Sequence, residues 1–144
     1  DAIDYAIEDK PDFLIDFATL TGAARVALGT ELPALFANNQ DTATDLLAAS
    51  QRSADPLWQL PLFDDYDRHL DAGYAALSST GLSGYGGAIT AALFLRRFAG
   101  RDINWVHIDV MAWNLAARPG RPKGGEAMGL RAVFEYIRIL ATAL

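Results

Sequence analysis

The alternation of apolar and polar positions predicts strands and helices that follow one another along the chain. Residues 13–19 form a nearly continuous apolar run, interrupted by Asp16, which predicts a strand with both faces covered. A Thr/Gly-rich turn then leads into a short helix over 21–28. This order puts backbone N–H groups at the carboxyl edge of a sheet, where open α/β sheets bind ligands. The turn is therefore a candidate binding edge, and a plain structural corner is the equally favoured alternative.

The rest of the pattern continues the alternation of strands and helices. In the strand expected over 105–110, polar and aromatic residues alternate with aliphatic ones. Such a succession predicts an α/β fold with a mostly parallel sheet sandwiched between helices. The other expected elements are the end of a helix over 1–8, a strand over 35–37, a helix over 42–53, an extended edge segment over 58–62, a short helix over 64–70, a loop over 72–85, a helix over 88–98, a Pro/Gly-rich basic loop over 114–125 and a terminal helix over 126–142.

Length, charge and composition limit the class of protein. The 144 residues suffice for one domain with a real core, and 51% of them are hydrophobic. The net charge of −6 argues against nucleic acid as a partner, because phosphate binding needs a basic surface. Without cysteine, a membrane-length apolar run or a secretory signal, we expect a soluble cytoplasmic protein with no membrane partner. The first residues have helical spacing but no N-cap motif, so we expect a piece of a longer protein.

The two histidines are candidates for chemistry. His69 lies among charged residues, and a solvated side chain is favoured over a site role. His107 and Asp109 point to the same side of the expected strand, where they could bind a metal or act as a general base. The favoured alternative is a core histidine hydrogen-bonded to its neighbour.

Two loops are weaker candidates. The glycines in residues 84–87 could cradle an anion before the next helix, or let that helix start close to the sheet. Arg118, Arg121 and Lys123 could face an acidic partner, although a solvated loop is favoured. From the residues alone, no catalytic constellation assembles.

Four stretches of the chain carry distinctive small-residue and aromatic motifs. Residues 17–29 read FATLTGAARVALG, 58–62 read WQLPL, 86–92 read GGAITAA and 105–109 read WVHID. A small-residue turn at Gly129 opens the last helix. In this order and spacing, the motifs resemble those of the leucyl (cytosol) aminopeptidases, a family of two-metal exopeptidases. The similarity covers nearly the whole chain.

The resemblance implies a three-layer, zinc-exopeptidase-like catalytic domain, of which residues 1–144 would be the C-terminal portion. In this family two divalent metal ions (manganese, zinc or magnesium) activate a water that attacks the N-terminal peptide bond. An arginine-held bicarbonate is implied as the base, and a lysine stabilises the developing charge. The implied partners are peptide substrates with a bulky apolar first residue, leucine above all, and further copies of the protein in a homo-hexamer.

The resemblance places the metal ligands and the catalytic lysine and arginine before Asp1, so no catalytic or metal-binding residue is expected in this chain. It assigns His107 and Asp109 to the fold, and Gly86 and Gly87 to the start of a helix. The isolated chain is accordingly expected to bind no catalytic metal and to be inactive. The alternative is a non-catalytic α/β scaffold or binding module with the same fold.

What the resemblance leaves to this chain is the wall of the substrate and bicarbonate pocket. Thr19, Leu20 and Gly22 match positions that touch the bicarbonate or the substrate and line the first specificity pocket. Thr80 matches the leaving-group side, and Met111 a position beside the first pocket. The segment around Met111, DVMAW, is two residues shorter than the DIAGTAW of many members, so a different pocket shape is expected.

Overall fold

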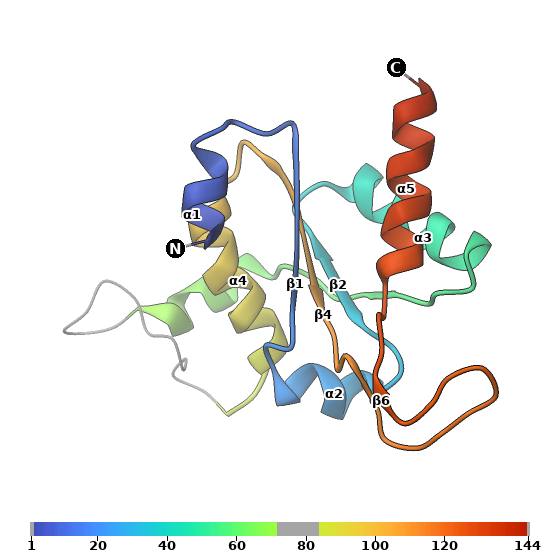
Figure 1. The fold of residues 1–144 in the computed structure, drawn as a ribbon. Helices are drawn as coiled ribbons and strands as arrows, with labels where there is room; N and C mark the ends of the chain where they lie inside the picture. The colour runs from blue at the N-terminus through green and yellow to red at the C-terminus, as the bar shows by residue number, and fades with distance from the viewer. Residues whose placement is uncertain (1, 72–83, 144) are drawn as a thin grey trace.

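The computed structural model describes residues 2–71 and 84–143. Its centre is a four-stranded sheet with the strand order β1-β4-β2-β3 (Figure 1). Two of the three pairings are parallel, β1 with β4 and β2 with β3, and β2 runs antiparallel to β4. The sheet is therefore mostly parallel, as predicted. The strands are β1 (Phe13–Ala18), β2 (Ala34–Ala37), β3 (Trp58–Gln59) and β4 (Asn104–Asp109).

Helices cover both faces of the sheet and make three layers (Figure 1). One face is covered by α2 and α4, with α1 packed on α4. The other face is covered by α3 and α5, which pack on each other. The predicted sandwich is thus confirmed. The helices are α1 (Ala2–Ile7), α2 (Gly22–Leu28), α3 (Gln40–Arg52), the 3-10 helix η1 (Asp64–Leu70), α4 (Gly87–Ala99) and α5 (Leu130–Ala143).

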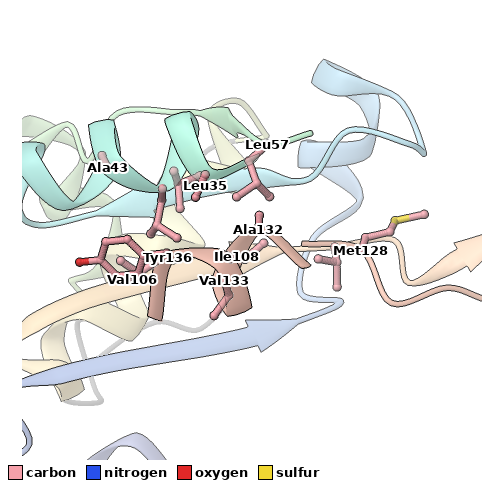
Figure 2. Close-up of a cluster of buried hydrophobic side chains, with 12 residues drawn as sticks. Leu35, Ala43, Leu57, Val106, Ile108, Met128, Ala132, Val133 and Tyr136 are labelled. Carbon is pink, nitrogen blue, oxygen red and sulfur yellow. The ribbon is translucent and has the colours of Figure 1, made fainter. Parts of the chain in front are cut away.

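The larger hydrophobic core lies between the sheet and the α3/α5 layer. Figure 2 shows Val106 and Ile108 of β4 beside the side chains of α5, with Leu35 of β2 nearby. The next residue on each strand points to the opposite face because side chains alternate along a strand. Phe36 accordingly joins a second, smaller cluster with alanines of α2 and α4.

The strand β1 is less buried than the apolar run over 13–19 predicts, and the most buried strand of the sheet is β4. β1 lies at an edge of the sheet, and its residues are half-buried or, at Phe17, exposed. β4 lies between β1 and β2, and five of its six residues are buried. A continuous apolar run reports covered faces, but it does not report whether a strand has neighbours on both sides.

The last two expected segments also differ from the structure. The expected loop over 114–125 contains a short antiparallel ladder of β5 (Trp113–Asn114) with β6 (Gly124–Gly125). The helix expected from residue 126 begins only at Leu130, because Gly129 before it has a φ of +79° that cannot continue a right-handed helix. The loop expected over 72–85 lies almost entirely outside the described residues.

None of the helices in the described part of the chain is long and apolar enough to cross a membrane.

Candidate functional site

The parallel pairing of β1 and β4 brings the expected pocket residues to one edge of the sheet. Ala18 lies opposite Asp109 at the ends of the two strands, and the N–H of Val110 donates to the carbonyl of Ala18 at 2.9 Å. The residues that follow each strand therefore emerge side by side. They are the turn Thr19–Gly22, here called the site turn, and Met111. Thr80, the remaining predicted pocket residue, lies outside the described residues.

The carboxylate of Asp109 holds the site turn by hydrogen bonds. It accepts the backbone N–H of Leu20 at 3.2 Å and that of Thr21 at 3.1 Å, together with the Thr21 hydroxyl at 2.6 Å. Asp109 is only 3% exposed. A buried carboxylate is stable when hydrogen bonds replace its lost water, and three donors do so here.

Thr21 links this carboxylate to helix α2. Its Oγ1 accepts the N–H of Ala24 at 3.0 Å, which makes Thr21 the N-cap of the helix. Because an amide N–H can only donate, the single proton of the hydroxyl must go to Asp109. Strand β4, the site turn and α2 are thus joined by one chain of directed hydrogen bonds.

The outer side of the site turn faces solvent. Thr19 and Gly22 are exposed, and so is Leu20, although it carries a large apolar side chain. A Cβ added at Gly22 would meet only the guanidinium of Arg25, at 3.9 Å. The described contacts therefore do not require glycine at position 22.

Met111 reaches the same edge from β4 by way of an unusual backbone. Met111 is half-buried against the larger core, and Ala112 after it has a φ of +53°, which is rare for a residue other than glycine. The carbonyl of Ala112 accepts the N–H of Glu126 at 3.0 Å. The short segment over 109–113 thus turns abruptly from β4 into β5.

The described residues form two apolar hollows, one near the candidate site and one away from it. A groove of about 270 Å³ separates the end of β1, at Phe17, from Leu130 and Val133 of α5. A larger hollow of about 590 Å³ lies between α3 and the segment over 54–59. No site-turn residue lines either hollow. In the described part of the chain, the site turn is therefore an exposed wall and not an enclosed pocket.

His107 lies in the core, as favoured, but its partner is not its neighbour. Its Nδ1 lies 2.6 Å from Oδ1 of Asp16, whose other oxygen accepts the indole N–H of Trp105 at 2.8 Å. The imidazole, 1% exposed, also stacks between the rings of Trp105 and Phe36. Sequence reasoning missed Asp16 in this role, although a carboxylate inside an apolar run was the available signal.

The residues that the structure describes do not fit a two-metal centre. Among the described residues, no group of three or more histidine, aspartate and glutamate side chains is placed to hold a metal ion. Both oxygens of Asp109 accept hydrogen bonds from the site turn, and Nδ1 of His107 is engaged by Asp16. The two residues that share a face of β4 are therefore committed to the fold.

The glycines before α4 serve a close approach of elements. Gly86 has a φ of +67°, and a Cβ there would lie 3.0 Å from the ring of Tyr66. A Cβ on Gly87 lies 3.2 Å from that of Ala23 in α2. These contacts agree with a helix that starts against its neighbours, and they tie α4 to the helix behind the site turn.

Two expectations of solvated side chains hold only in part: Lys123 is exposed, whereas the two arginines and His69 are half-buried with partners in the chain. Arg118 pairs with Glu31 and donates to Asn114, and Arg121 pairs with Glu126 at 2.6 Å, so these cations of the loop are neutralised within the chain. His69 is half-buried with its ring against that of Tyr66. Glu31 is 87 residues from Arg118, so sequence spacing could not reveal that partner, whereas the others lie within five residues along the chain.

Comparison with known proteins adds independent findings. The model of the cytosol aminopeptidase family, catalytic domain, matches residues 1–134. The probable cytosol aminopeptidase of Prochlorococcus marinus (strain MIT 9215) is 41% identical over 140 residues, which are 96% of this chain and 28% of that protein. The cytosol aminopeptidase of Coxiella burnetii superposes with a TM-score of 0.92 at 53% identity, over 96% of this chain and 30% of that one. A mutant of tomato leucine aminopeptidase superposes with a TM-score of 0.83 at 35% identity, over 95% of this chain and 26% of that one.

The TM-scores show that the three-layer α/β fold is shared with these two aminopeptidases. The chain belongs to the cytosol aminopeptidase family. It spans less than a third of the length of the relatives that it matches.

Proposed function

We propose that the chain is the C-terminal portion of the catalytic domain of a metal-dependent aminopeptidase of the leucyl type, which removes N-terminal residues from peptides. The observation that carries this proposal is the family match over residues 1–134, together with 53% identity to a solved cytosol aminopeptidase at a TM-score of 0.92. The names of the relatives further support a cytosolic protein. A homo-hexamer is proposed from the resemblance alone.

In this proposal the site turn is the wall of the pocket for the first residue of the peptide. Thr19, Leu20 and Gly22 line it, Met111 lies beside it, and Thr80 lines the leaving-group side. Support comes from the exposure of the site turn and from its position at the carboxyl edge of the sheet. Because the N–H of Leu20 donates to Asp109, Leu20 offers a substrate its carbonyl as an acceptor and its isobutyl group as an apolar contact.

Two divalent metal ions, manganese or zinc, would supply the activated water of this reaction. The donor set of the described residues does not fit them. We therefore propose that their ligands lie in residues outside 1–144, and we assign no step of the reaction to this chain. The chain contributes the pocket wall, which orients the N-terminal residue of the peptide and excludes water from that wall of the pocket.

The test compares the chain with the full-length protein that carries it. We expect the full-length protein with manganese or zinc to hydrolyse leucine p-nitroanilide and to contain two metals per protomer. We expect the 144-residue chain to do neither. Stoichiometric metal in the isolated chain would contradict the proposal that the metal ligands lie outside residues 1–144. A metal-free, inactive full-length protein would support the alternative, a non-catalytic scaffold or binding module.

A further inference from the structure

We propose that Asp109 is a positioning residue of this site: by holding the backbone of Leu20 and Thr21, its carboxylate sets the shape of the pocket wall and hence the preference for a bulky first residue. The inference rests on the proposed function and deepens it. Asp109 touches no substrate in this scheme, and it acts through the site turn.

The first step of the argument is that the site turn depends on Asp109 for its shape. The described hydrogen bonds of the turn converge on one carboxylate, which comes from β4, 88 and 89 residues along the chain from its donors. The turn follows an edge strand and has solvent on its outer side. Another described hydrogen bond of the turn is the N-cap bond from Ala24 to Thr21, which joins the turn to α2 and not to β4.

The second step is that the interaction requires a carboxylate. All three partners donate, and the Thr21 proton is committed to Asp109 because its oxygen already accepts the N–H of Ala24. A carboxylate accepts at both oxygens, whereas an asparagine amide has one acceptor and turns its NH₂ toward a donor. Asp109→Asn is nearly the same size, so it changes the hydrogen bonds of the turn without removing volume.

The third step is that the chain contains a matched control. Asp55 is equally buried, at 3%, and also accepts three N–H groups from a distant segment, those of Gly129, Arg131 and Ala132. Its donors belong to the start of α5 and not to the site turn. Asp55→Asn therefore makes the same chemical change to a carboxylate that holds no predicted pocket residue.

The experiment measures kcat and KM of the full-length manganese enzyme with leucine and alanine p-nitroanilides. We expect Asp109→Asn to lower the preference for leucine over alanine, the ratio of the two kcat/KM values, by about tenfold, mainly through KM, since a lost charge-assisted hydrogen bond has that size. We expect Asp55→Asn to lower the melting temperature and leave the preference unchanged. Thr21→Val should reduce the preference, and Thr21→Ser, which keeps the hydroxyl, should return it toward the wild-type value.

Each outcome decides the inference. A preference unchanged in Asp109→Asn, or changed as much in Asp55→Asn, overturns it while the proposed function stands. A wild-type enzyme that hydrolyses neither substrate overturns the proposed function, and the inference with it. If Asp109→Asn fails to fold, the Thr21 pair decides, because an equal preference in Thr21→Val and Thr21→Ser contradicts a role for the bond to Asp109.

Discussion

Two buried carboxylates hold two different regions of this molecule by the same means. Asp109 fixes the site turn before α2, and Asp55 fixes the start of α5, each through three hydrogen bonds to residues at least 74 positions away. They differ in surroundings. The bonds of Asp55 to Gly129 and Ala132 are buried, whereas those of Asp109 are only partly so, and the turn above it faces solvent. The comparison teaches that a buried carboxylate, which orders the core at the start of α5, can also hold an exposed turn at the edge of the sheet.

The largest expected effect is on stability when either carboxylate is removed. Asp55→Ala strands N–H groups in the core and takes a negative charge from the positive end of α5, so we expect a loss of about 3 kcal/mol. We expect Asp109→Ala to cost about 2 kcal/mol, because water can reach part of the site turn. Thermal unfolding of the full-length variants measures the difference. The larger loss in Asp109→Ala would show that the turn is more deeply fixed than its burial indicates.

Substitutions of two glycines, one in each region, should have different effects on stability and on kinetics. Gly129 has a φ of +79°, and its added Cβ would lie 3.3 Å from both Leu57 and Phe17, so Gly129→Ala should destabilise by about 2 kcal/mol. Gly22 is the first residue of α2 and has open space, so Gly22→Ala should leave the melting temperature unchanged and raise the KM for leucine p-nitroanilide. An unchanged KM would argue that the pocket wall does not extend to Gly22.

Two alanines with left-handed backbones give a smaller, paired effect. Ala54 precedes Asp55 with a φ of +50°, and Ala112 follows Met111 with a φ of +53°. Glycine relieves this strain but makes the unfolded chain more flexible, so each substitution should stabilise by less than about 1 kcal/mol. Only Ala112→Gly should alter the kinetic constants, because it lies beside the predicted pocket. A kinetic change in Ala54→Gly of the same size would contradict that assignment.

The smallest expected effect concerns an exposed carboxylate, which contrasts with the two buried ones. Hydrogen bonding and charge from Arg96, 2.6 Å away, hold the pKa of Asp64 below its ordinary value. The ionised form is thus favoured by folding. This contribution is present above the ordinary pKa of about 4 and is lost as the pH falls through the lower value of the folded state. Asp64→Asn should slightly lower the melting temperature at pH 7 and leave it unchanged near pH 2. An equal decrease at both pH values would rule out the charge as the cause.

Much of the local structure could be predicted because neighbouring residues encode it. The apolar run before Thr19, the Thr/Gly-rich turn after it and the glycine after Leu28 predict the β1–α2 unit, which the structure confirms. The same logic failed at residue 126, because α5 has no N-cap side chain of its own. The carboxylate that caps α5 belongs to Asp55, and the sequence of residues 126–130 does not indicate this distant partner.

The contents of the site were harder to predict for a related reason. The resemblance named Thr19, Leu20 and Gly22, but it did not name Asp109, which holds the backbone of Leu20 and Thr21 in the same turn. Spacing along one strand paired His107 with Asp109, whereas the sheet pairs His107 with Asp16, its register partner on β1. Residues two apart on a strand share a face, but the partner across the ladder is nearer.

The sequence by itself determined the order of strands and helices, the α/β class and the motifs of the family, because periodicity, caps and turn residues act over a few positions. Only the tertiary structure decided that β1 is an edge strand, that Asp55 caps α5 and that Asp109 holds the site turn. These contacts join residues 74 to 89 positions apart. Which distant residues meet depends on the order and register of the strands, and that order follows from burying all elements at once.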